Sequence, residues 1–87
     1  MLFQVSITIP TNNYRTTLER FKQGGGPPPP NVRMIGRWHH ADGSGAVVIC
    51  ETNDPIGLGK WSAEWADVIG LQICPVLTDE EILKALS

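Results

Sequence analysis

The sequence has few cysteines, few charged residues and no long hydrophobic run. Only Cys50 and Cys74 are present, without a Cys-x-x-Cys motif, so we expect no zinc or iron–sulfur site. No apolar stretch approaches the ~18 residues that cross a bilayer, and the first residues lack a charged segment followed by an apolar one. We therefore expect a cytoplasmic protein with reduced thiols, no bound metal and no membrane partner.

Two nucleotide-binding signatures are also missing. The basic residues are spaced singly instead of clustering with aromatic side chains, which argues against a nucleic-acid partner. The triplet Gly24-Gly25-Gly26 follows a helical pattern, whereas a dinucleotide fingerprint requires a strand before it, so no cofactor is indicated. Charge is uneven: residues 1–40 hold five basic and one acidic side chain, and residues 41–87 hold two and eight. Either the fold mixes the halves or two copies meet through complementary charge.

The length and the hydrophobic content predict one small globular domain spanning residues 1–87. Hydrophobic residues make up 41% of the chain, an ordinary share. A chain of this size hides only about 60–65% of its unfolded surface by folding alone. With three tryptophans in so few residues, we expect the core to be completed by a homodimer contact.

The first half of the chain shows a strand pattern followed by a helix pattern. Residues 2–9 alternate apolar and polar side chains, and Pro10 ends this predicted strand. Side chains of residues 11–13 offer caps for a helix that runs to about residue 23. Its apolar stripe consists of Tyr14, Leu18 and Phe21. The glycine triplet ends it, and residues 27–30, all proline, form a stiff connection.

The second half predicts a hairpin, a helix, a strand and a short terminal helix. Strands at residues 32–41 and 46–52 flank a glycine-containing turn at residues 42–45. Asp54 and Pro55 suit the start of a second helix reaching about residue 69. A last strand covers residues 71–77, where Pro75 favours an edge position. Thr78 to Glu81 resembles a capping box that opens a C-terminal helix.

This order of elements is that of the ferredoxin-like βαββαβ fold, an α+β architecture. Such a domain has a four-stranded antiparallel sheet in the order four, one, three, two, with two helices on one face. The helices then cover the apolar side of residues 2–9 and leave Gln4, Ser6 and Thr8 on an open face. Cys50 and Cys74 lie on strands separated by a third, too far apart for a disulfide.

Several short motifs carry a resemblance to a known family. They are Gly36-Arg37-Trp38-His39, Glu51, Asp54, Trp61, Trp65-Ala66-Asp67, Pro75-Val76-Leu77 and Glu80-Glu81. Over nearly the whole chain the sequence resembles a family of short bacterial proteins known only as a domain of unknown function. That family is similar in architecture to the dimeric α+β barrel superfamily, which includes cofactor-free monooxygenases, haem-degrading enzymes, isomerases and non-catalytic members. The resemblance implies a homodimer whose two sheets face each other, and it names no chemistry.

Strand alternation divides the polar and aromatic cluster around residue 38 between two faces. Met34 and Trp38 suit the helix-covered side, beside the tryptophans at 61 and 65, which we expect to pack in the core. Arg37 and His39 then join Gln4, Ser6 and Thr8 on the open face, and these five residues form the predicted ligand-binding set.

The register of the third strand is open at this point, because it depends on the length of the hairpin loop. A three-residue loop places Val47, Ile49 and Glu51 on the surface that carries Arg37 and His39, whereas a two- or four-residue loop places Val48 and Cys50 there. We favour the first register, because Glu51 inside a core would need a partner.

Two functional hypotheses follow. In the first, the protein is a non-catalytic homodimer or binds a small molecule. In the second, it is a cofactor-independent oxygenase- or isomerase-like enzyme. His39, a side chain type that exchanges protons near neutral pH, would then be the base. Arg37 would hold an anionic oxygen, and Glu51 would complete the set.

Overall fold

The computed structural model describes all residues 1–87 as one antiparallel sheet with three α-helices. The strands are β1 (Leu2–Thr8), β2 (Arg33–His39), β3 (Gly45–Glu51) and β4 (Gly70–Val76). Their order in the sheet is β2-β3-β1-β4, which confirms the predicted ferredoxin-like topology. The two edges are therefore β2 and β4, and Pro75 lies on an edge strand as predicted.

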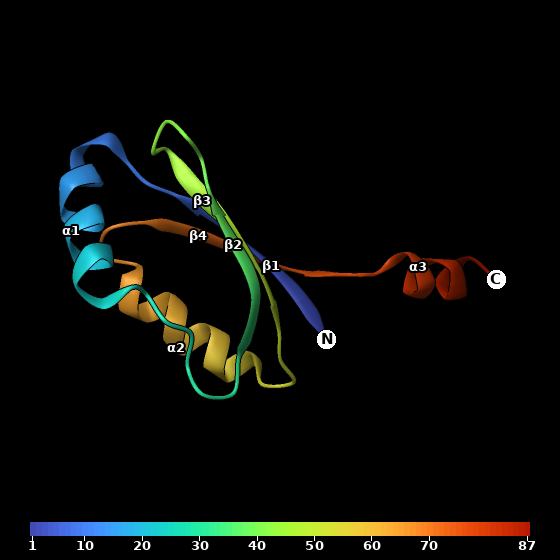
Figure 1. Ribbon diagram of the computed structural model, residues 1–87. Coiled ribbons are helices and arrows are strands. Elements are labelled where there is room, and N and C mark those ends of the chain that lie inside the picture. The colour runs from blue at the N-terminus through green and yellow to red at the C-terminus, as the bar shows by residue number, and fades with distance from the viewer.

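The helices divide into two that cover the sheet and one that leaves it. α1 (Tyr14–Gly24) and α2 (Pro55–Trp65) lie on the same face of the sheet, whereas α3 (Asp79–Leu86) stands well away from the body (Figure 1). A short 3-10 turn at Thr11–Asn13 precedes α1. None of the helices is both long enough and apolar enough to cross a membrane.

The core forms where the alternating side chains of β1 meet those of β3 under the helices. Phe3 lies opposite Cys50, and Val5 lies opposite Val48, which is fully buried. Trp61 of α2 closes this cluster and is only 8% exposed. The predicted core position of Trp61 is confirmed, while the neighbouring Trp65 is half-buried at its edge.

Three of the predicted helix ends are confirmed and two are wrong, since α2 ends at Trp65 and not near residue 69. The Asp54 side chain accepts a hydrogen bond from the Ile56 amide at 3.1 Å and so caps α2. Thr78 forms the predicted capping box with Glu81. Gly25 ends α1 in the left-handed region, at φ 72°, which glycine adopts without steric cost. The side chain of Asn13 does not cap α1 but donates a hydrogen bond to the Val68 carbonyl at 3.0 Å.

The two cysteines occupy opposite faces of the sheet on either side of β1. Cys50 pairs in register with Phe3, and Cys74 with Gln4, so the strand between them keeps them apart as predicted. Both thiols are free, Cys50 buried and Cys74 exposed. Burial raises the pKa of the Cys50 thiol, because the charged thiolate loses its hydration.

Candidate functional site

An irregularity in β2 decides which face of the sheet carries the predicted site residues. Met34 pairs with Cys50 and Gly36 with Ile49, so the register shifts at Ile35, the extra residue of a bulge. Beyond the bulge, Arg37 pairs with Val48 and therefore points to the helix-covered face.

The predicted positions of Trp38, Arg37 and His39 are therefore wrong. Regular alternation correctly puts Met34 under the helices, but the bulge reverses every side chain after it. Trp38 is on the open face and is 57% exposed. Its ring lies over Gly36, where a Cβ would collide with it. The predicted ligand-binding set is divided, because Gln4, Ser6 and Thr8 do lie on the open face, away from Arg37 and His39.

The hairpin after β2 has a four-residue loop, which is the alternative that we did not favour. His40 donates its amide to the Gly45 carbonyl at 2.9 Å, and residues 41–44 form the loop between them. Arg37 and His39 consequently share a face with Val48 and Cys50. Glu51 points to the open face, where Arg33 binds it at 2.8 Å. This hydrogen bond lowers the pKa of Glu51 and removes the carboxyl from the predicted acid–base set.

A cavity of about 80 Å³ lies between the helices and the sheet. Thirteen of the 18 residues that line it are hydrophobic, so it is a mainly apolar space with few polar groups. Its polar or charged side chains come from both helices and from β2: they are Thr17, Ser62, Arg37 and His39. Apolar pockets with a small number of polar groups are typical of small-molecule sites. The cavity is therefore the candidate functional site.

Arg37 is in the cavity wall, but its guanidinium is already engaged. It donates to the Gly26 and Gly25 carbonyls, at 2.8 Å each, beyond the C-terminal end of α1. The same group lies 4.8 Å from the centre of the Phe21 ring, a cation–π contact. Partial burial lowers the pKa of Arg37. Arg37 therefore joins β2 to α1, and its main role in this geometry is structural.

His39 lies at the rim of the cavity on the edge strand β2. Its ring meets the Phe21 ring edge-on, with 5.2 Å between the ring centres. The residue as a whole is exposed, so one side of the imidazole faces solvent while it lines the cavity. Among the predicted catalytic candidates, only His39 both lines the cavity and has a side chain without a hydrogen bond to the rest of the protein.

Thr17 is the functional candidate that sequence reasoning missed. It is 5% exposed, lines the cavity from α1, and its hydroxyl has no hydrogen-bond partner. Helical threonines often bond the carbonyl four residues earlier, and this one does not. A usable signal was present: Tyr14, Thr17, Leu18 and Phe21 follow the spacing of one helix stripe, so Thr17 is a polar residue in an apolar row. Ser62 of α2, one residue after Trp61, also lines the cavity with a hydroxyl group.

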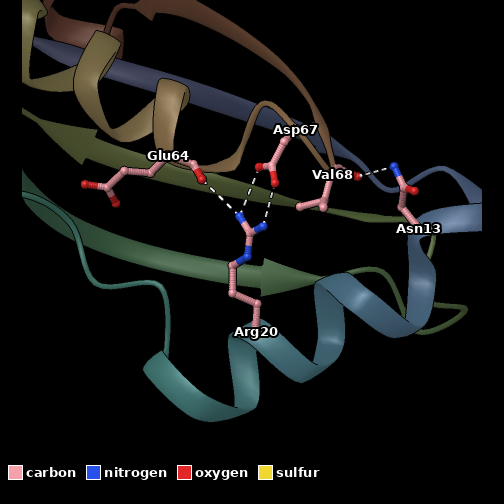
Figure 2. A network of polar contacts seen from close by, with 5 residues as sticks. All are labelled: Asn13, Arg20, Glu64, Asp67 and Val68. Atoms are coloured by element: carbon pink, nitrogen blue, oxygen red, sulfur yellow. Dashed lines mark hydrogen bonds and ion pairs between the residues drawn. The ribbon is translucent and has the colours of Figure 1, made fainter.

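The two helices above the cavity are joined at the C-terminal end of α2. Arg20 of α1 binds both oxygens of Asp67, at 3.0 and 2.7 Å, and also the Glu64 carbonyl at 3.0 Å (Figure 2). Asn13 adds its bond to the carbonyl of Val68. The pKa of Asp67 is lowered by its hydrogen bond from Arg20. These contacts hold α1 against α2 and so fix the roof of the cavity.

No group of three or more His, Cys, Asp or Glu side chains lies close enough to hold a metal ion.

A comparison with known protein families shows to which family the chain belongs. The family described as a domain of unknown function, DUF3303, matches residues 1–87. The chain belongs to this family. Among solved structures, one that is similar is Rv0793 from Mycobacterium tuberculosis, with a TM-score of 0.52 and 13% identity. The match covers 90% of this chain and 96% of that one. At this identity the likeness concerns the fold. No curated protein sequence matches the chain significantly.

Proposed function

We propose that this DUF3303 protein is a homodimer that binds a small molecule in the cavity between its helices and its sheet. The observation that carries the proposal is the buried hydroxyl of Thr17, which lacks a partner inside a mainly apolar cavity. Leaving a buried hydroxyl unpaired costs about 1–3 kcal/mol, so a ligand that supplies a hydrogen bond gains this energy back. The expected ligand has a small apolar body and one hydrogen-bonding group.

The size of the cavity limits the buried part of this ligand. An apolar cavity of about 150 Å³ in another protein holds benzene, so a cavity of about 80 Å³ encloses roughly half of a benzene-sized ring. The rest of such a ring extends past His39, which is exposed at the rim. Arg37 contributes little to binding in this proposal, because two main-chain carbonyls already occupy its guanidinium.

The test compares phenol with toluene, which are similar in size but differ in their hydrogen-bonding group. Methyl NMR spectra of the cavity residues Val48 and Leu58 should shift with both ligands, and phenol should bind more tightly. Thr17→Val keeps the shape of the side chain and removes the hydroxyl. It should reduce phenol affinity by about five- to tenfold and leave toluene affinity unchanged or higher.

The matched control is Thr16→Val, an equivalent change at the adjacent exposed threonine of α1. It should leave both affinities unchanged. Equal effects of the two substitutions, or shifts confined to residues outside the cavity, would show that Thr17 recognises no ligand.

The dimer part of the proposal rests on the open face of the sheet. The helices leave this face uncovered, and Trp38 stands on it beside the half-buried Val47 and Ile49. A large exposed aromatic residue with apolar neighbours is typical of an interaction site. Sedimentation equilibrium should give twice the 9.5 kDa chain mass, and Trp38→Glu should shift it toward one chain. Ile56→Glu, at an exposed apolar residue of α2, should have no such effect.

Catalysis is a second candidate function, and His39 is the observation that favours it. Its ring is the only imidazole that lines the cavity, so it is placed to exchange a proton with a bound molecule. Incubation of an identified ligand with the protein, followed by mass spectrometry, tests this. Product formation that His39→Gln abolishes, with binding retained, would support an enzyme; an unchanged ligand would support a binding protein.

A cytoplasmic location is also part of the proposal, because free thiols are typical of reducing compartments.

A further inference from the structure

The C-terminal helix α3 has no contact partner in its own chain. It follows β4 after an extended link and projects from the body of the molecule (Figure 1). Every residue from Leu77 to Ser87 is exposed. The arm formed by residues 77–87 is the part of the chain that the fold and the cavity leave unexplained.

The helix in the arm is amphipathic. Ile82, Leu83 and Leu86 occupy one side of α3, and they are 42%, 65% and 77% exposed. Glu81 and Lys84 lie on the opposite side. Isolated helices shorter than about 12–15 residues are marginal in water, so an eight-residue helix with an apolar stripe needs a surface to cover.

The start of α3 directs the arm away from its own sheet. Thr78 is extended, with φ −73° and ψ 168°, and its hydroxyl accepts from the Glu81 amide at 3.2 Å. In return, the Thr78 amide donates a hydrogen bond to the Glu81 carboxylate at 3.0 Å. With this box in place, α3 lies away from the sheet of its own chain (Figure 1). In this conformation only another molecule can cover the apolar stripe of α3.

We propose that this molecule is a second copy of the chain, and that the two copies exchange arms, each α3 packing against the open sheet face of the other. In a two-fold symmetric pair the same patch is used twice, so one contact buries both arms. This inference rests on the homodimer proposed above and adds the element that completes its interface.

The area of the open face supports a second copy as the occupant. Four strands of seven residues, about 4.8 Å apart with about 3.3 Å per residue, cover only roughly 400 Å² in projection. A stable interface buries about 800 Å² of accessible surface on each partner, so a sheet face of this size gains from the further surface that the arms supply.

The test introduces charge into the apolar stripe of the full-length protein. Leu83→Glu with Leu86→Glu should raise the dimer dissociation constant by about a hundredfold or more, measured by sedimentation equilibrium. Because α3 packs on nothing in its own chain, the body should keep its wild-type circular dichroism in the sheet region. Lys84→Glu, on the opposite side of the same helix, is the matched control and should dimerise like the wild type.

A second measurement shows which copy the arm contacts. In a mixture of ¹³C-labelled and unlabelled chains, isotope-filtered NOEs should connect α3 methyl groups of one copy to the Trp38 ring of the other. NOEs found only within one copy would overturn arm exchange. Wild-type dimerisation by the Leu83→Glu and Leu86→Glu variant would overturn it too and leave the sheet-to-sheet dimer standing. A wild-type protein that stays at 9.5 kDa would reject both.

Discussion

Replacing Arg37 by alanine tests whether this residue serves the fold or a ligand. The guanidinium donates to two carbonyls beyond the end of α1 and lies over the Phe21 ring, so its loss should free β2 from α1. In the ligand-holding role predicted from the sequence, the same substitution would reduce binding and leave stability nearly unchanged. The two interpretations therefore differ in the free energy of unfolding.

The expected loss follows from the contacts. A hydrogen bond from a charged donor contributes about 1.5–3 kcal/mol when shielded from water, and an exposed cation–π contact about 0.5–1 kcal/mol. Because the Arg37 side chain is only half-buried, each hydrogen bond is taken below that range, at about 1 kcal/mol. We expect Arg37→Ala to lower the free energy of unfolding by about 2–4 kcal/mol, or the melting temperature by about 10–20 °C. Arg37→Lys should recover less than half, because an ammonium cannot bridge both carbonyls in the same way.

The control is Arg33→Ala, the same change four residues earlier on β2. Arg33 also has a 2.8 Å partner, Glu51, but its side chain is 67% exposed on the open face, so its loss should matter little. Urea unfolding of the three variants gives the comparison. Equal midpoints for Arg37→Ala and Arg33→Ala would refute the structural role of Arg37.

Three further predictions concern the core, the sheet and the join between helices. Trp61→Ala should cost about 3–5 kcal/mol in urea unfolding, because a nearly buried ring is removed from the core, and wild-type melting would contradict this. Gly45→Ala should cost about 1–3 kcal/mol, since its Cβ would collide with the Ile7 carbonyl, whereas Gly59→Ala meets open space and should be neutral or stabilising. Arg20 lowers the pKa of Asp67, so this pair stabilises the fold above the usual carboxyl pKa of ~3.9, and the effect is lost as pH falls through the lowered value. The stability difference between wild type and Asp67→Asn should therefore exist at pH 7 and shrink below about pH 4; a pH-independent difference would contradict it.

The element order was predictable because it rests on local physical signals. The period of two in β1 reflects a sheet with one buried face, and the structure buries Phe3 and Val5 as that pattern requires. Glycine and capping residues marked most helix ends. The predicted helix 55–69 instead ends at Trp65, because the chain turns there so that Val68 and Ile69 reach the core. Tertiary packing decided this boundary, and no local pattern carries that information.

The candidate site was less predictable, because it depends on register. A shift of one residue moves all later side chains of a strand to the other face. One signal was available: glycine inside a strand pattern often marks a bulge, and Gly36 stands directly after the bulged Ile35. With that bulge, Arg37 and His39 would have been placed toward the helices. The hydroxyl of Thr17 in the α1 stripe would then have been their expected neighbour.

The bulge affects the site and leaves the fold intact because β2 is an edge strand. The buried pairs of β1 and β3 define the core, so the sheet keeps its order whichever way the end of β2 points. The same irregularity provides both proposed surfaces: it turns Arg37 and His39 into the cavity wall and puts Trp38 on the open face. Gly36 is suited to this double role, because the Trp38 ring occupies the place where any other side chain would begin. The bulge at Ile35 thus determines which side chains of β2 line the cavity and which lie on the open face.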